Sequence, residues 1–66
     1  MNNLMKAYHW YEANGFETDP DTVNNLLYLT VWDHALENTI VVELSQAEID
    51  ERAKLYDEQF KQKDTL

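Results

Sequence analysis

The sequence predicts a mainly α-helical domain with three helices, near residues 3–14, 20–37 and 46–62, and one short extended segment at 39–44. Three local signals carry this prediction: a glycine after the first helix, an Asp-Pro pair before the second and a Ser-x-x-Glu box before the third. Hydrophobic residues make up 44% of the chain and aromatic residues 12%. This composition favours a folded chain over a disordered one.

The first helix is predicted from its end and its apolar face. Gly15, the only glycine, suits the left-handed position just past a helix, and Phe16 would then fold back onto Tyr11. At 100° per residue one face is apolar; its members are Leu4, Ala7, Tyr8 and Tyr11. Trp10 lies away from that face and is therefore expected at the surface.

The middle segment, residues 20–37, supports two interpretations. Asp19 is a good N-cap, Pro20 suits the first helical position and Asp21 suits the positive end of the helix dipole. We therefore expect a helix. However, residues 26–32 are rich in Tyr, Thr, Val and Trp, which favour strands. The alternative is an α+β domain with a hairpin of 26–32 and 39–44 between two helices.

The last helix has the strongest start signal. Ser45 and Glu48 have the spacing of a capping box, directly after the β-branched, extended segment at 39–44. Ile49, Ala53, Tyr56 and Phe60 form a narrow apolar stripe. We expect residues 1–62 to form a single small globular domain, followed by a frayed tail at 63–66.

Charge is the most unusual property of the chain. Thirteen carboxylates face five Lys and Arg residues, which gives a net charge of −8. No lysine or arginine occurs between Lys6 and Arg52. Such a surface repels nucleic acid and anionic lipid and attracts basic proteins. We therefore expect no direct nucleic-acid binding, no membrane association and a basic protein partner.

Catalytic and metal-binding patterns are weak. The chain has no cysteine, and its only serine has a capping role, so we expect no enzyme activity. His9 with Glu12, and His34 with its acidic neighbours, fall short of a three- or four-ligand site, so we expect no metal and no cofactor. The first residues lack the pattern of a signal peptide, and no apolar run is long enough for a membrane span, so we expect a cytoplasmic protein.

These features predict a small acidic binding protein that occupies a basic, nucleic-acid-handling host protein. The small size and the charge are those of phage- or mobile-element-type inhibitors, and the carboxylates could act by imitating a phosphate backbone. The predicted partner-binding residues are the anchors Trp10, Tyr28 and Trp32 and the acids Glu12, Glu17, Asp19, Asp21, Asp33 and Glu37. The alternative is a homo-oligomeric structural or accessory protein, such as a homodimer, whose acidic surface keeps it soluble.

Overall fold

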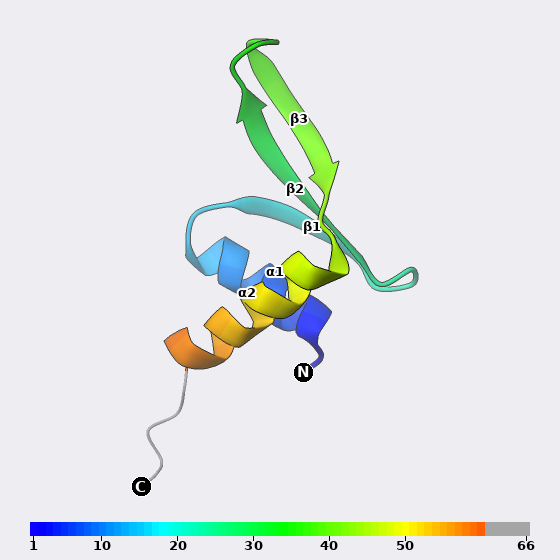
Figure 1. Ribbon diagram of the computed structural model, residues 1–66, viewed down its shortest axis with the longest axis vertical. Coiled ribbons are helices and arrows are strands. Elements are labelled where there is room, and N and C mark those ends of the chain that lie inside the picture. The colour runs from blue at the N-terminus through cyan, green and yellow to red at the C-terminus, as the bar shows by residue number, and fades with distance from the viewer. Residues whose placement is uncertain (61–66) are drawn as a thin grey trace, which may run out of the picture.

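The structure, a computed structural model, describes residues 1–60 and is of the α+β class. Its elements are α1 (Asn3–Ala13), β1 (Glu17–Asp21), β2 (Leu26–Asp33), β3 (Asn38–Glu43) and α2 (Gln46–Gln59). The strands form one antiparallel sheet in the order β1-β2-β3. The two helices lie together at one end, and the β2–β3 hairpin projects away from them (Figure 1). The end of the predicted third helix, residues 61–62, and the predicted tail lie outside the described residues.

The three-helix prediction is wrong, because residues 20–37 form strands and turns instead of a helix. The misleading signal was Asp19-Pro20. Pro20 lies opposite Leu27 in the edge strand β1. The C=O of Leu27 accepts the N–H of Leu44 on the other side, so Leu27 directs its backbone polar groups toward that side. Leu27 therefore needs no hydrogen bond from Pro20. An edge strand therefore tolerates the proline as well as a helix start would.

The hairpin of the alternative interpretation is present. β2 and β3 pair with Tyr28 opposite Glu43 and Trp32 opposite Thr39. The extended segment predicted at 39–44 is strand 38–43. That alternative also lacked β1, whose sequence, Glu-Thr-Asp-Pro-Asp, has little intrinsic preference for strands. The pairing with β2, and not propensity, therefore makes β1 a strand.

The predicted start and end of the first helix and the predicted start of the last helix are confirmed, whereas α2 ends at Gln59 instead of near residue 62. Asn2 caps α1, and beyond its last turn Gly15 has a φ of 87°. The N–H of Phe16 donates to the C=O of Tyr11 at 2.9 Å, as a Schellman ending requires. At the start of α2, Ser45 and Glu48 form both bonds of the capping box.

Two turns of the same construction connect the strands. Asp21 accepts the backbone N–H groups of Val23 and Asn24, and Asp33 accepts those of Ala35 and Leu36. Each loop ends in a residue with positive φ, 58° at Asn25 and 53° at Glu37. An aspartate that folds back onto its own turn fixes a four-residue hairpin loop. Both hairpin registers are therefore set locally.

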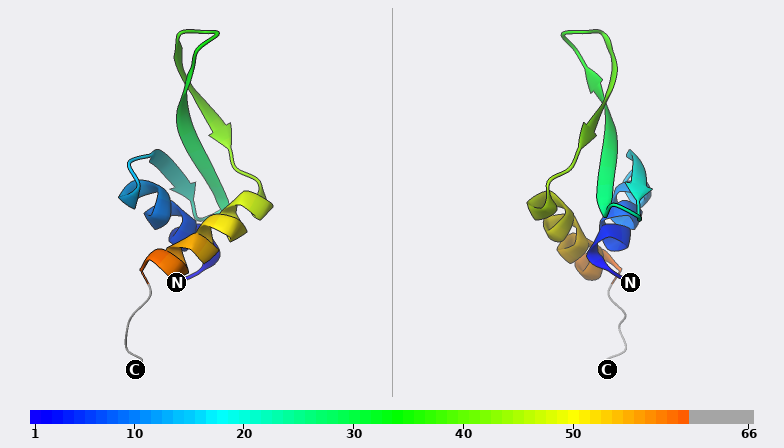
Figure 2. Two further views of the ribbon diagram at one scale, coloured as in Figure 1. Left: turned by 60° about the vertical axis from the view of Figure 1, so that its left-hand side comes forward. Right: turned by 90° about the vertical axis from the view of Figure 1, so that its right-hand side faces the viewer.

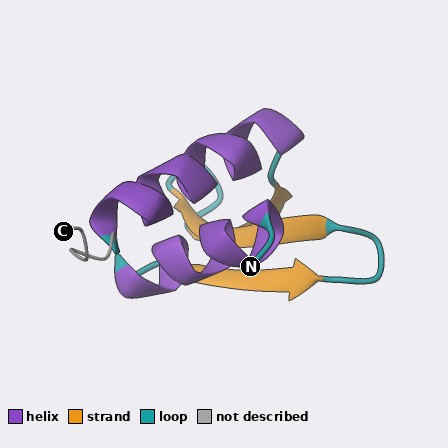
Figure 3. Cartoon of the chain, turned by 90° about the horizontal axis from the view of Figure 1, so that it is seen from below, coloured by secondary structure: helices purple, strands orange, loops and turns teal. Residues whose placement is uncertain are grey.

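The core lies between the two helices and one face of the sheet. Leu27 of β2 is fully buried and packs with Leu4, Ala7 and Tyr11 of α1 and with Leu44 and Ile49. Viewed from the helical end, the helices lie side by side in front of the strands (Figure 3). Polar contacts at the rim, such as Lys6 with Asp57 at 2.9 Å, also join the two helices. Neither helix among residues 1–60 has the length and apolarity needed to cross a membrane.

Candidate partner-binding face

The sheet has a second face, opposite the core, which we call the open face. Side chains alternate between the two faces of a strand, and Leu27 points into the core, so its neighbours in β2 point the other way. Directly paired residues share a face, so the strand register assigns the rest. The open face consists of Glu17, Asp19 and Asp21 of β1, Leu26, Tyr28, Thr30 and Trp32 of β2, and Thr39, Val41 and Glu43 of β3.

Carboxylates flank an aromatic ring at the centre of the open face. Tyr28 has Asp19 as its partner in β1 and Glu43 as its partner in β3. Directly opposite Cβ atoms in an antiparallel pair lie about 4.5–5.5 Å apart. The phenol ring of Tyr28 therefore has an acidic side chain on each side of it.

The apolar part of this face lies toward the tip of the hairpin. Trp32 is 54% exposed and Val41 is 63% exposed. The ring of Trp32 meets the ring of His34 edge-on, with centroids 6.4 Å apart. The projection of β2 and β3 beyond the helices leaves this part of the hairpin accessible (Figure 2). Exposed aromatic surface beside charged residues is typical of protein-binding sites.

Positive charge is separated from this face. Within residues 1–60 the cations are Lys6, Arg52 and Lys54, and all of them lie on the helices. Lys6 pairs with Asp57, and Arg52 donates from Nε to the Tyr11 hydroxyl at 3.1 Å. That hydrogen bond from Arg52 to Tyr11 raises the pKa of Arg52. The three strands consequently carry carboxylates with no neutralising cation among them.

The predicted partner-binding residues fall into three places. The open face holds Glu17, Asp19, Asp21, Tyr28 and Trp32; α1 holds Trp10 and Glu12; the β2–β3 hairpin tip holds Asp33 and Glu37. Trp10 was expected at the surface, and its position differs most from the expectation. Its indole is partly buried against the core, and the guanidinium of Arg52 lies 5.0 Å from the ring centroid. This tryptophan therefore joins α1 to α2.

Several of the predicted acids have local structural roles. The side chain and backbone N–H of Asn24 lower the pKa of Asp21, and the backbone N–H of Val23 lowers it further. Asp33 caps the hairpin tip. The carboxylate of Glu12 raises the pKa of the Tyr8 phenol. Of the acids on the open face, Glu17, Asp19 and Glu43 have exposed side chains outside these turns.

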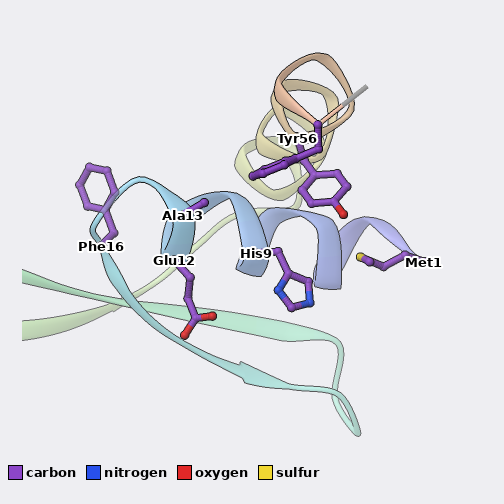
Figure 4. A pocket seen from close by; sticks show the side chains of 7 residues that line it. Met1, His9, Glu12, Ala13, Phe16 and Tyr56 are labelled. Atoms are coloured by element: carbon purple, nitrogen blue, oxygen red, sulfur yellow. The ribbon is translucent and has the colours of Figure 1, made fainter. Parts of the chain in front are cut away.

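A shallow groove of about 650 Å³ lies along α1 and the last turn of α2. Its lining includes His9, Glu12, Phe16 and Tyr56. In Figure 4 His9 and Glu12 project from α1, and Phe16 stands apart at the loop. The rings of His9 and Tyr56 have centroids 6.5 Å apart. These side chains do not converge on one point, as an acid-base pair would need to do. Among residues 1–60 no three His, Asp or Glu side chains gather as metal ligands either.

The sequence interpretation did not include Val41 and Glu43 in the site. The available signal was the alternation of residues 26–32 against 39–44, which would have placed Glu43 beside Tyr28 if the hairpin had been preferred. The chain matches no protein-family model, and no curated protein and no solved structure matches it.

Proposed function

We propose that the chain is a non-enzymatic binding protein that holds a basic, nucleic-acid-handling protein against the open face of its sheet. The observation that carries this proposal is the arrangement around Tyr28, between Asp19 and Glu43, on strands that contain no lysine or arginine. The proposed site of action is the cytoplasm, where a chain without cysteine needs no disulfide.

Attraction and anchoring come from different residues of this face. A net charge of −8 draws a basic partner from a distance, and the Debye length of about 8 Å at physiological salt limits the range. After contact, Trp32 and Tyr28 supply the large apolar contact area that dominates binding energy in protein interfaces. The carboxylates then fix the orientation of the partner's lysines and arginines.

The more specific form of the proposal is imitation of a short phosphate stretch by a phage- or mobile-element-type inhibitor. Glu17, Asp19 and Asp21 occupy alternate positions of β1, so they repeat about every 6.7 Å. One strand of DNA carries a charge about every 3.4 Å of axis. The row therefore has about half the linear charge density of one strand, and Glu43 adds charge two strands away. A basic groove that accepts a few phosphates fits this arrangement.

A homo-oligomeric accessory protein is the second candidate function. The observation that favours it is the outer edge of β3, which pairs with no strand among residues 1–60. The two candidates use different surfaces of the sheet, because the first needs the open face and the second needs the edge.

The direct test is capture from a lysate of the native host by the immobilised chain, at low and at high salt. We expect a nucleic-acid-binding protein to be retained at low salt, and to be released by high salt or by added DNA or RNA. A partner that stays bound when DNA or RNA is added would contradict the imitation of a phosphate stretch. Retention of no basic protein at low salt would contradict the proposed function.

A further inference from the structure

The two edges of the sheet differ in their readiness to pair. The β1 edge is short and contains Pro20 and three acids. The β3 edge has neither proline nor charge from Thr39 to Val42. Proteins usually protect exposed strand edges with proline, charge or a covering element. Among residues 1–60, proline and three acids protect the β1 edge, whereas Glu43 is the only charge of β3, so the β3 edge remains open to another strand.

The hydrogen bonds between β2 and β3 determine which backbone groups of β3 face outward. The N–H of Leu44 donates to the C=O of Leu27 at 2.8 Å, so Leu44 directs its backbone polar groups toward β2. These groups alternate in direction along an antiparallel strand. The N–H and C=O groups of Thr39, Val41 and Glu43 therefore point outward. In the single chain the N–H of Thr39 donates to Oδ1 of Asn38 at 2.8 Å.

We infer that β3 pairs antiparallel with β3 of a second copy, so that Val41 lies opposite Val41 of that copy. The same register sets Thr39 opposite Glu43 of the second copy, on both sides of the two-fold axis. All three outward-facing residues then exchange both backbone bonds, about six hydrogen bonds in total. Two of these replace the bond from the Thr39 N–H to Asn38 in each copy. The pair of valines at the axis covers side chains that are 63% exposed in the single chain.

A second copy can pair along this edge without a charge clash between the two strands. In the register centred on Val41, no two like charges lie directly opposite each other, because each Glu43 faces a threonine. The protected β1 edges become the two ends of a six-stranded sheet, so assembly stops at two copies. The two-fold axis runs perpendicular to the sheet, so both open faces lie on the same side of the dimer.

Two lysine substitutions test the register, and each serves as the control for the other. Val41→Lys and Thr39→Lys both change the net charge from −8 to −7. In the dimer, Val41→Lys sets two lysines directly opposite each other, and Thr39→Lys sets each lysine opposite a glutamate. We expect sedimentation equilibrium to show dimers with a dissociation constant about fivefold higher for Val41→Lys and about fivefold lower for Thr39→Lys. A wild-type mass of 7.8 kDa at every concentration would overturn the inference. So would equal shifts in the two variants, since these would reflect net charge alone.

A cysteine scan gives a second measurement that does not depend on how the lysine variants fold. The chain has no cysteine, so a single one reports only on contacts between copies. Opposite residues in a hydrogen-bonded antiparallel pair have Cα atoms about 5.5 Å apart, which a disulfide can span. Val41→Cys should cross-link at least about tenfold faster than Val23→Cys, whose parent side chain is 90% exposed on the β1–β2 turn. Equal rates would refute the pairing.

The dependence on salt distinguishes the proposed dimer from the proposed partner binding. Two copies of like net charge repel each other, so added salt should strengthen the dimer. Capture of a basic partner should weaken under the same change. Either result can therefore fail without the other.

Discussion

The guanidinium of Arg52 lies over the indole of Trp10, with its central carbon 5.0 Å from the ring centroid. The contact joins α2 to α1, and Phe16 stacks on the same indole at 6.3 Å. Trp10 is thereby assigned to the fold, and Trp32, which is 54% exposed, is the tryptophan of the proposed binding face.

Substitution of the two tryptophans should separate stability from binding. We expect Trp10→Ala to lower the free energy of unfolding by about 2–4 kcal/mol, because it removes a large, partly buried ring. Trp32→Ala should change it by less than about 0.5 kcal/mol, as exposed positions usually do. Urea denaturation of the two variants measures the difference. Equal losses of stability would show that Trp32 is also part of the fold, and would remove it from the proposed binding face.

The turn at Asp21 predicts a specific dependence on pH. Hydrogen bonds from Asn24 and Val23 lower the pKa of this carboxyl in the folded state. The stabilisation is therefore fully present above the ordinary aspartate pKa of 3.8, and it is lost as the pH falls through the lower folded-state value.

The test of this dependence compares the melting temperatures of the wild type and Asp21→Asn at pH 7 and below pH 4. We expect the wild type to be the more stable protein at pH 7 and its advantage to shrink in acid. The comparison cancels the change in overall charge repulsion, which affects both proteins. An advantage that stays constant with pH would contradict the proposed role of the ionised carboxylate.

Glu37 has an unfavourable backbone conformation at the tip of the β2–β3 hairpin. Its φ of 53° lies in the left-handed region, which asparagine tolerates better than glutamate does. We expect Glu37→Asn to raise the free energy of unfolding by about 0.5–1 kcal/mol. Asn25→Asp, at the matching position of the other turn, is the control for adding a charge in this conformation. A loss of stability in Glu37→Asn would mean that the glutamate side chain makes a compensating contribution.

Local signals predicted those parts of the fold that local structure determines. Gly15 and the Ser45–Glu48 box set helix ends through hydrogen bonds within a few residues, so they could be inferred from the sequence alone. The structure of the segment around Asp19-Pro20 could not be inferred from local signals. An N-cap with a proline and an edge strand with a proline are compatible with the same residues, and the choice depends on pairing with β2.

The sequence also predicted only part of the candidate site. In residues 17–32 the structure leaves Glu17, Asp19 and Trp32 exposed, while Asp21 and Tyr28 are half-buried. Their assembly into one face depends on sheet register, which a helical interpretation of residues 20–37 could not supply. Glu43 and Val41 were missed for this reason, and Trp10 was misplaced because its partner, Arg52, is 42 residues away along the chain.

In the proposed function, partner binding depends on the open face and not on net charge alone. Two double variants with identical chemistry test it: Glu17→Gln with Glu43→Gln on the open face, and Glu51→Gln with Glu58→Gln on exposed positions of α2. Both change the net charge from −8 to −6. The measurement is the amount of basic partner captured by each immobilised variant at low salt. We predict a loss of at least about fivefold for the open-face variant and less than about twofold for the α2 variant. Equal losses would show that net charge alone attracts the partner, and would contradict the assignment of the open face.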